Sequence, residues 1–404
     1  MMCPKIAKRL KSVEYAIRKF APIARELERK GKKIIPLNIG DPLKFDFHTP
    51  EHIKEALCKA VKNNKNYYLE SKGLRELREA ICEKEKRNYG ISIDPEHVVV
   101  TQGVAEAINF VIGTFIDPGD EILVPSPTYP SYIGETLAHY GKPVEYVCRE
   151  DLGWMPDIED IRKKISEKTK LIVIINPNNP TGSVYDEKIV REILGIAAEN
   201  DLVVVSDEIY DRIIFEGNFK STASLSKDTV VIGLNGFSKI YLMTGWRLGY
   251  LYVYDPTGEH ADEITELIMK KAMNRICANT PVQYAGVVAI RGPHDHVSKM
   301  MDKLRKRRDL IYKRIVEIED MSTVKPEGTF YIFPKISLGQ TWKNDEDFVL
   351  ELLKEEGVFL VHGSGFGETC GFGHFRAVFL PSEEIINEAF DKIEKFIKRK
   401  KLSR

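Results

Sequence analysis

The stretch TVVIGLNGFSKIYLMTGWRLGYLYVY, residues 229–254, decides the fold expected for this chain. It opens on an apolar run without polar alternation, which is typical of a strand buried on both faces of a parallel sheet. That run ends at Ser238 and Lys239, and a second apolar run starts only a short loop later. Because the chain returns so directly, we expect the second strand to lie antiparallel to the first.

The segments before this stretch repeat the pattern of buried strand and helix. KLIVIINPNNPTG (170–182) reads as a strand and turn, DEKIVREILGIAAEND (186–201) as a helix, and LVVVSDEIY (202–210) as a strand. Alternation of this kind predicts an α/β fold with a mostly parallel sheet covered by helices. From about residue 290 the chain has a long charged helix, short apolar segments and a final amphipathic helix, which indicates a smaller α+β domain. We therefore expect a large domain over 48–290 and a small domain built from 1–47 and 291–404.

Composition narrows the possible partners and location. The 404 residues include 60 basic and 60 acidic side chains, and this balance argues against a general nucleic-acid or membrane-surface binder. The six cysteines have no CxxC spacing, so we expect reduced thiols and neither a disulfide framework nor a zinc site. The basic N-terminus has no apolar signal region, and no run approaches the length of a membrane span. These features predict a cytoplasmic protein.

Polar residues follow three of the predicted core strands, at 176–182, 207–210 and 238–239. Because ligands bind beyond the carboxyl ends of strands in open α/β sheets, we expect these residues to meet in one cleft. The set holds no His or Cys, which does not suit a metal site or a Ser-His-Asp hydrolase, and no GxGxxG follows the first strand. It does suit pyridoxal phosphate, which needs a lysine, a carboxylate beside its ring nitrogen, donors to its phenolic oxygen and an anion site.

At these motifs the chain resembles the class I, fold-type I aminotransferases over nearly its whole length. The motifs that carry the resemblance are NPNNPTG (176–182), SDEIY (206–210), SKIYLMTGWRLGY (238–250) and HFRAVFLP (374–381). The alanine aminotransferase branch looks closest, through VEYAIR (13–18), YYLESKGLRELREAI (67–81), NGFSK (235–239) and RICANTPVQ (275–283). The resemblance implies three α/β/α layers around a mostly parallel seven-stranded sheet with one antiparallel strand, a smaller α+β domain, pyridoxal 5′-phosphate and a homodimer.

The resemblance also assigns roles at the cofactor. Lys239 would bind it covalently and then act as the general base, and a neutral amine is required for both. Asp207 would keep the pyridine nitrogen protonated, and Tyr210 and Asn179 would donate to the phenolic oxygen. Tyr129 would stack on the ring.

The phosphate of the cofactor would be held by the N–H groups of Val104 and Ala105 at a helix N-terminus, by Ser238 and by Arg247. Tyr68 would reach the phosphate from the neighbouring subunit. The chain departs from many members of the family at Gly236 and Ala105, where they carry hydroxyls or a lysine, although the alanine branch shows the same glycine.

At the substrate, Arg376 would clamp the α-carboxylate with two parallel hydrogen bonds, assisted by Asn179. Gly40 would lie against the substrate backbone and Tyr15 would line its side-chain pocket. The expected reaction converts L-alanine and 2-oxoglutarate to pyruvate and L-glutamate.

Three other functions stay open at this level. The first is a β-lyase or decarboxylase that uses the same cofactor, because the motifs describe the cofactor site. The second is transamination of aspartate or aromatic amino acids, although no arginine for a second carboxylate stands out. The third is a non-catalytic regulator that senses the cofactor, which the neutral charge and the lack of room for a DNA-binding domain disfavour.

Overall fold

A computed structural model describes residues 7–339 and 341–402 of the chain. Its centre is an eight-stranded sheet in the order β2-β9-β8-β7-β6-β3-β4-β5. The strands are β2 (Val98–Thr101), β3 (Glu121–Ser126), β4 (Lys142–Arg149), β5 (Met155–Pro156), β6 (Thr169–Ile175), β7 (Val203–Asp207), β8 (Val231–Gly236) and β9 (Gly249–Tyr254). Within the run β8-β7-β6-β3-β4, every pair of neighbouring strands is parallel. Strand β9 is antiparallel to both of its neighbours, β8 and β2, which confirms the prediction from residues 229–254.

The sheet has one strand more than the seven that we expected. The extra strand, β5, is two residues long and pairs antiparallel with the end of β4. It follows the short 3-10 helix η4 (Glu150–Leu152) and a tight turn at Gly153, whose φ is +72°. A pair of residues is too short to show a strand period in the sequence, so only the pairing with β4 reveals it.

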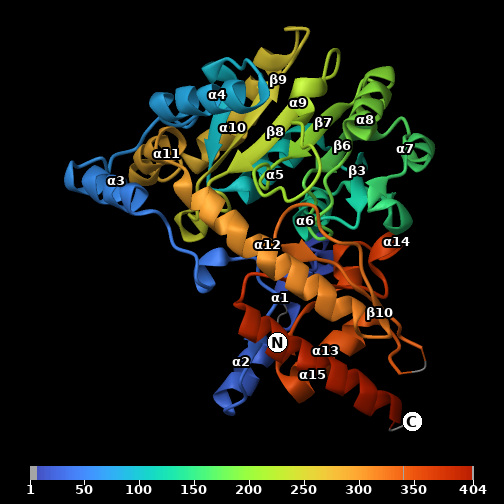
Figure 1. Ribbon diagram of the computed structural model, residues 1–404. Coiled ribbons are helices and arrows are strands. Elements are labelled where there is room, and N and C mark those ends of the chain that lie inside the picture. Colours follow the sequence, from blue (N-terminus) through green and yellow to red (C-terminus); the bar gives the residue numbers. More distant parts are fainter. Residues whose placement is uncertain (1–6, 340, 403–404) are drawn as a thin grey trace, which may run out of the picture.

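Helices cover both faces of this sheet, as the unbroken apolar strands predicted (Figure 1). Alternate residues of one strand belong to different cores: Leu171 and Val173 pack on one face, Ile172 and Ile174 on the other. The helices of the first face are α5 (Val104–Phe115), α6 (Pro130–Ala138) and α10 (Ala261–Arg275). Those of the second face include α4 (Arg75–Tyr89), α7 (Ile158–Lys164), α8 (Glu187–Glu199) and α11 (Thr280–Arg291), which packs on α3 (Glu51–Lys62); α9 (Thr222–Leu225) precedes β8.

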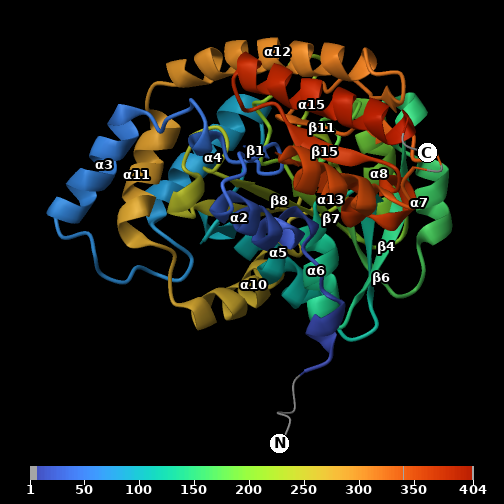
Figure 2. The ribbon, with the colours of Figure 1, turned by 90° about the horizontal axis from the view of Figure 1, so that it is seen from below.

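A smaller α+β part follows the long helix α12 (Asp295–Val316), which runs from the sheet toward the lower half of the molecule (Figure 1). Its strands are β10 (Met321–Ser322), β11 (Tyr331–Ile332), β12 (Lys335–Ile336), β13 (Val358–Phe359), β14 (Val361–His362) and β15 (Phe375–Val378). Its helices are α13 (Asp345–Glu356), α14 (Glu368–Gly371) and α15 (Glu383–Leu402). Figure 2 shows α15 lying beside α12, and Ile386, Phe390, Ile393 and Ile397 of α15 are buried.

The N-terminal segment packs on this smaller part. It contains α1 (Ala16–Lys19), α2 (Ala21–Arg29) and β1 (Ile35–Pro36), and β1 pairs in parallel with β13. The remaining short helices are η1 (Arg9–Ser12), η2 (Pro42–Lys44), η3 (Pro95–His97), η5 (Thr244–Trp246) and η6 (Gly363–Phe366). The chain thus returns to its own start, and residues near position 15 and near position 376 reach the same region.

Two further observations concern partners and location. Among residues 7–339 and 341–402, no helix is long and apolar enough to cross a membrane. Cysteines 58, 82, 148, 277 and 370 are free thiols, and Cys3 lies outside the described residues.

Candidate functional site

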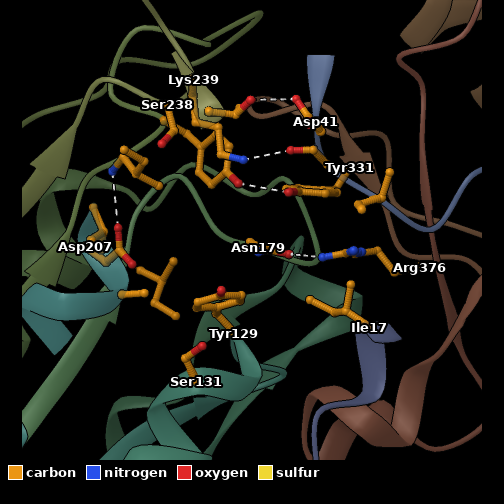
Figure 3. Close-up of a pocket in the computed structure, with 18 of the residues that line it drawn as sticks. Ile17, Asp41, Tyr129, Ser131, Asn179, Asp207, Ser238, Lys239, Tyr331 and Arg376 are labelled. Carbon is orange, nitrogen blue, oxygen red and sulfur yellow. Dashed lines mark hydrogen bonds between the residues drawn. The ribbon is translucent and has the colours of Figure 1, made fainter. Parts of the chain in front are cut away.

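The carboxyl ends of β6, β7 and β8 open into a cavity of about 670 Å³. The smaller α+β part and the N-terminal segment close it from the opposite side (Figure 3). Every predicted site residue except Tyr68 lines this cavity, namely Tyr15, Gly40, Val104, Ala105, Tyr129, Asn179, Asp207, Tyr210, Ser238, Lys239, Arg247 and Arg376. The expected convergence of strand ends is therefore present.

Lys239 stands in the loop that follows β8, with its side chain in the cavity. Its Nζ donates a hydrogen bond of 2.7 Å to the carbonyl oxygen of Gly40 (Figure 3). Burial lowers the pKa of this amine to about 8, with Asp41 opposing the shift and the positive charge of Arg376 adding to it. About a tenth of the amine is therefore neutral at pH 7, far more than for an ordinary lysine, and a nucleophile or base requires this neutral form.

Asp207 is the last residue of β7 and is buried. One carboxylate oxygen accepts from the backbone N–H of Ile209 at 3.2 Å, and the other accepts from the hydroxyl of Tyr132 at 3.0 Å. Burial raises the pKa of Asp207 to about 6, while these two donors and Lys239 act in the opposite sense. The carboxylate can thus pair with a protonated ring nitrogen in the cavity.

Arg376, on β15, is almost completely buried and faces Asn179. Its Nη1 donates to Oδ1 of Asn179 at 3.0 Å (Figure 3). Its Nη2 donates to the carbonyl oxygen of Asn38 at 2.6 Å. Its Nε is buried and has no hydrogen-bond partner among the described residues. Each terminal nitrogen carries a second N–H besides these two bonds, so a buried guanidinium that lines the cavity is suited to an incoming carboxylate.

An anion site lies at the other end of the cavity, where the first turn of α5 meets Arg247. Val104 and Ala105 begin this helix, and no described group accepts a hydrogen bond from their N–H groups. Arg247 has a φ of +55°, a conformation that is strained for a residue with a side chain and is typical of functional loops. Its guanidinium donates to the carbonyl oxygens of Thr244 and Gln102, at 2.9 and 3.4 Å. The helix N-terminus and the cation together favour a phosphate.

Glycines explain the departure from the wider family at position 236. Gly249 on β9 pairs with Gly236 on one side and with Thr101 of β2 on the other. A Cβ on Gly236 would lie 3.1 Å from the Cα of Gly249, and a Cβ on Gly249 would lie 2.7–2.9 Å from the backbone of Gly103 and Val104. The strands are therefore too close for a larger residue at 236 without adjustment, and this closeness brings the start of α5 toward Arg247.

Tyr15 and Tyr129 join across the cavity through their hydroxyls, which are 3.1 Å apart. Tyr15 precedes α1 and Tyr129 precedes α6, so the pair connects the N-terminal segment to the large sheet. The predicted Tyr68 is not part of this site in one chain: its side chain is 79% exposed and lies outside the cavity.

Several lining residues were not predicted from the sequence: Ile17, Arg18, Ile39, Asp41, Ser131, Ile175, Ile209, Thr244, Gly245 and Tyr331. Arg18 lies three residues after Tyr15 in the VEYAIR segment, and that spacing could have indicated it. Tyr331 stands in the GTFYIFPKI segment, where nothing distinguishes it from its aromatic neighbours. Tyr331 lies at the cavity because β11 pairs with β15, the strand that carries Arg376.

The residues of the cavity fit pyridoxal phosphate. An amine of lowered pKa, a buried carboxylate and an anion site are separate groups of one cavity, and the guanidinium of Arg376 lines the same cavity. No described group of His, Cys, Asp and Glu side chains could hold a metal ion.

Comparison with known proteins agrees with this geometry. Residues 32–393 match the family of class I and II aminotransferases. The chain is 38% identical over 397 residues to a glutamate-pyruvate aminotransferase of Haemophilus influenzae (AlaA), covering 96% of this chain and 97% of that protein. It is 37% identical to an aromatic-amino-acid aminotransferase of Thermococcus litoralis, covering 96% of each.

Among solved structures, an alanine aminotransferase from Pyrococcus furiosus superposes with a TM-score of 0.95 at 55% identity, over 98% of this chain and all of that one. Identity at this level over the whole length shows common ancestry as well as a common fold. This chain is a member of the class I and II aminotransferases, which are transaminases that use pyridoxal 5′-phosphate.

Proposed function

We propose that the enzyme transfers the amino group of L-alanine to 2-oxoglutarate, forming pyruvate and L-glutamate. The observation that carries this proposal is the buried guanidinium of Arg376, which lines the same cavity as Lys239. The tyrosine pair of Tyr15 and Tyr129 encloses the same cavity and favours a small side chain on the amino donor. The named activities of the relatives from Haemophilus and Pyrococcus support alanine as that donor.

The cofactor would be held by separate groups of this chain. Lys239 would bind its aldehyde carbon, Asp207 would pair with its ring nitrogen, and Tyr210 and Asn179 would donate to its phenolic oxygen. The start of α5, Ser238 and Arg247 would hold its phosphate, and Tyr129 would pack on its ring. When bound, the cofactor withdraws electron density from the Cα of the amino acid, which makes the Cα proton removable.

The proton transfer belongs to Lys239. Its neutral Nζ would take the proton from Cα of the amino acid and hold it as an ammonium group, and its lowered pKa of about 8 keeps a part of the amine neutral. Arg376 holds the α-carboxylate in a bidentate manner and Asn179 holds the guanidinium, so the Cα–H bond keeps one orientation relative to Lys239. Burial of the surrounding side chains excludes water from this step.

The second substrate, 2-oxoglutarate, carries an additional carboxylate. Arg18 lines the cavity beside Tyr15, and no described residue forms an ion pair or hydrogen bond with its guanidinium. A free cation at this end of the cavity favours a dicarboxylate in the half-reaction that involves glutamate. L-alanine has no second carboxylate to bind Arg18, so this residue would distinguish the dicarboxylate substrates from L-alanine.

We further propose that the active form is a homodimer in the cytoplasm, in which Tyr68 reaches the cofactor phosphate of the partner. The 79% exposure of Tyr68 leaves its hydroxyl free for such a contact. We also propose that residues 48–290 form the large domain and that 1–47 and 291–404 form the small domain. The pairing of β1 with β13 supports the inclusion of the N-terminal segment in the small domain.

An absorbance titration of the purified enzyme tests the proposed substrates. The band of the bound cofactor should change on addition of L-alanine or L-glutamate, and 2-oxo acids should restore it. A change with L-phenylalanine or L-aspartate but not with L-alanine would replace the donor. Release of free ammonia instead of L-glutamate would indicate a β-lyase.

The role of Arg18 has its own control. Arg18→Gln should raise KM for L-glutamate and 2-oxoglutarate about tenfold, as expected for one lost charged hydrogen bond, and leave KM for L-alanine nearly unchanged. An equal rise for all three would show that Arg18 only shapes the cavity.

A further inference from the structure

Tyr331 lies where the residues of the cofactor wall meet those of the substrate wall. It belongs to β11 in the smaller α+β part and is buried. Its hydroxyl is 2.9 Å from the hydroxyl of Tyr210, which comes from the large sheet (Figure 3). None of the residues proposed to bind the cofactor or the substrate is Tyr331.

The ring of Tyr331 also supports Arg376. The Cζ atom of the guanidinium lies 4.4 Å from the centre of the Tyr331 ring and 4.8 Å from that of Phe366. A guanidinium placed over aromatic rings is held by cation–π attraction and keeps its plane. Because Arg376 must present two N–H groups in one plane to a carboxylate, the rings restrict the direction from which the carboxylate binds.

Either hydroxyl can be the donor of the hydrogen bond between Tyr331 and Tyr210. A phenol has a single proton. If Tyr210 gives its proton to the phenolic oxygen of the cofactor, as proposed above, Tyr331 must donate the bond and Tyr210 must accept it. The proton of Tyr210 is then available for the cavity.

The close packing of Tyr331 against Gly40 keeps this arrangement in place. A Cβ on Gly40 would collide with the Tyr331 hydroxyl, so only a glycine allows the ring to lie there. The carbonyl oxygen of the same glycine accepts the hydrogen bond of Lys239. Tyr331 therefore contacts Tyr210, Arg376 and Gly40 at once.

We propose that Tyr331 is a positioning residue of the transaminase: its hydroxyl orients the proton of Tyr210 toward the phenolic oxygen of the cofactor, and its ring orients Arg376 toward the substrate carboxylate. This inference rests on the functions proposed above for Tyr210 and Arg376. The hydroxyl and the ring act on different partners, so two substitutions separate them.

The hydroxyl is tested with Tyr331→Phe, Tyr210→Phe and the double variant, all loaded with pyridoxal phosphate. The readout is the pH midpoint at which the absorbance of the bound cofactor changes. A hydrogen bond donated to the phenolic oxygen stabilises its ionised form, so losing or weakening that bond raises the midpoint. We expect the pH midpoint to rise by about 0.5 to 1 pH unit in Tyr331→Phe and by more in Tyr210→Phe. The double variant should show no further rise beyond that of Tyr210→Phe.

Tyr146→Phe is the matched control, because the Tyr146 hydroxyl is also buried but donates to the backbone oxygen of Val173 outside the cavity. Its midpoint should equal that of the parent enzyme. A raised midpoint in Tyr210→Phe together with an unchanged one in Tyr331→Phe would overturn the inference alone. An unchanged midpoint in Tyr210→Phe would remove the proposed role of Tyr210 and the inference with it.

The ring is tested with propionate, which has the carboxylate of alanine but no amino group and so binds without reacting. Tyr331→Leu should weaken propionate binding to the loaded enzyme about tenfold, whereas Tyr331→Phe should bind it as the parent does. Equal affinity in all three proteins would refute the support of Arg376 by the ring. Should Tyr331→Leu fail to fold, the series of phenylalanine variants still decides the role of the hydroxyl.

Discussion

The hydroxyl of Tyr132 donates a hydrogen bond of 3.0 Å to Oδ2 of Asp207, and both side chains are buried beneath the cavity. Among the residues that the structure describes, the other hydrogen-bond donor to this carboxylate is the N–H of Ile209. With so few donors, burial already raises the pKa of Asp207 to about 6, and Tyr132 limits that rise. The ionised state that the cofactor nitrogen needs therefore depends on the N–H of Ile209 and on the phenol of Tyr132, and of these two only the phenol is a side chain.

Tyr132→Phe should weaken the affinity for pyridoxal phosphate about tenfold, because the loss of a donor to a charged group raises the pKa of Asp207 further. A carboxylic acid of raised pKa is more often neutral at low pH, so the deficit should be larger at about pH 6 than at about pH 8. Cofactor titrations at both pH values measure it. Tyr146→Phe serves as the control, and an equal deficit at both pH values would contradict the ionisation argument.

The pKa of Lys239 predicts a stability effect in the enzyme without cofactor. Above pH 8 the native lysine is neutral, whereas in the unfolded chain it stays protonated up to its ordinary pKa of 10.5. The unfolded state then binds more protons, so the free energy of unfolding receives a contribution from Lys239 that rises with pH between about 8 and 10.5. Lys239→Met should lack this contribution.

Urea unfolding at several pH values compares Lys239→Met with the parent. The variant should be the more stable of the two near neutral pH, and its advantage should shrink across that window. Lys188→Met changes an exposed lysine of α8 and should follow the parent at every pH. A constant difference between Lys239→Met and the parent would show that the lysine is not shifted.

Arg376→Lys keeps the charge but removes the planar pair of donors. A lysine cannot bind Asn179 and the substrate carboxylate in the same fixed arrangement. We expect KM for L-alanine and for pyruvate to rise about tenfold to a hundredfold, which corresponds to the loss of a charge-assisted hydrogen bond. The affinity for the cofactor should not change. Weaker cofactor binding with normal KM values would place Arg376 at the cofactor instead.

Gly249→Ala tests the close contact behind the phosphate site. The added Cβ would lie 2.7–2.9 Å from the backbone of Gly103 and Val104, so the start of α5 must move. Affinity for pyridoxal phosphate should fall about tenfold, while affinity for pyridoxal, which has no phosphate, should stay the same.

Gly195→Ala is the matched control for that substitution. Gly195 lies in the exposed part of α8, and a Cβ there meets no atom within 4 Å. Alanine should raise the free energy of unfolding by about 1 kcal/mol through helix propensity and leave both affinities unchanged. A parallel loss of affinity for pyridoxal in Gly249→Ala would mean that the whole site had shifted.

Much of the site could be predicted because function and local pattern coincide along the chain. Asn179, Asp207 and Lys239 each follow a run of Val and Ile that can only be a buried strand. Parallel strands present their carboxyl ends at one edge, so residues in those positions must converge. The antiparallel return of β9 was equally readable, since a short loop cannot cross the sheet.

The contacts that set the ionisation and orientation of these site residues could not be predicted from the local pattern of the sequence. Tyr132 contacts Asp207 from an α-helix and Tyr331 lines the cavity from a two-residue strand, and no local period marks either of them. Strand β5 was not predicted from the sequence for the same reason, because a pair of residues has no periodicity.

The sequence by itself determined the class of fold and the strand ends that carry chemistry, because hydrophobic periodicity and residue type are local properties. The roles expected for single residues at the cofactor came from the motifs that resemble those of a known family. Only the tertiary structure decided which side chains surround those residues and so the pKa of Lys239, the donor to Asp207 and the support of Arg376 by Tyr331. These depend on burial and on distances between residues far apart in the chain, and electrostatic and packing energies change steeply with both.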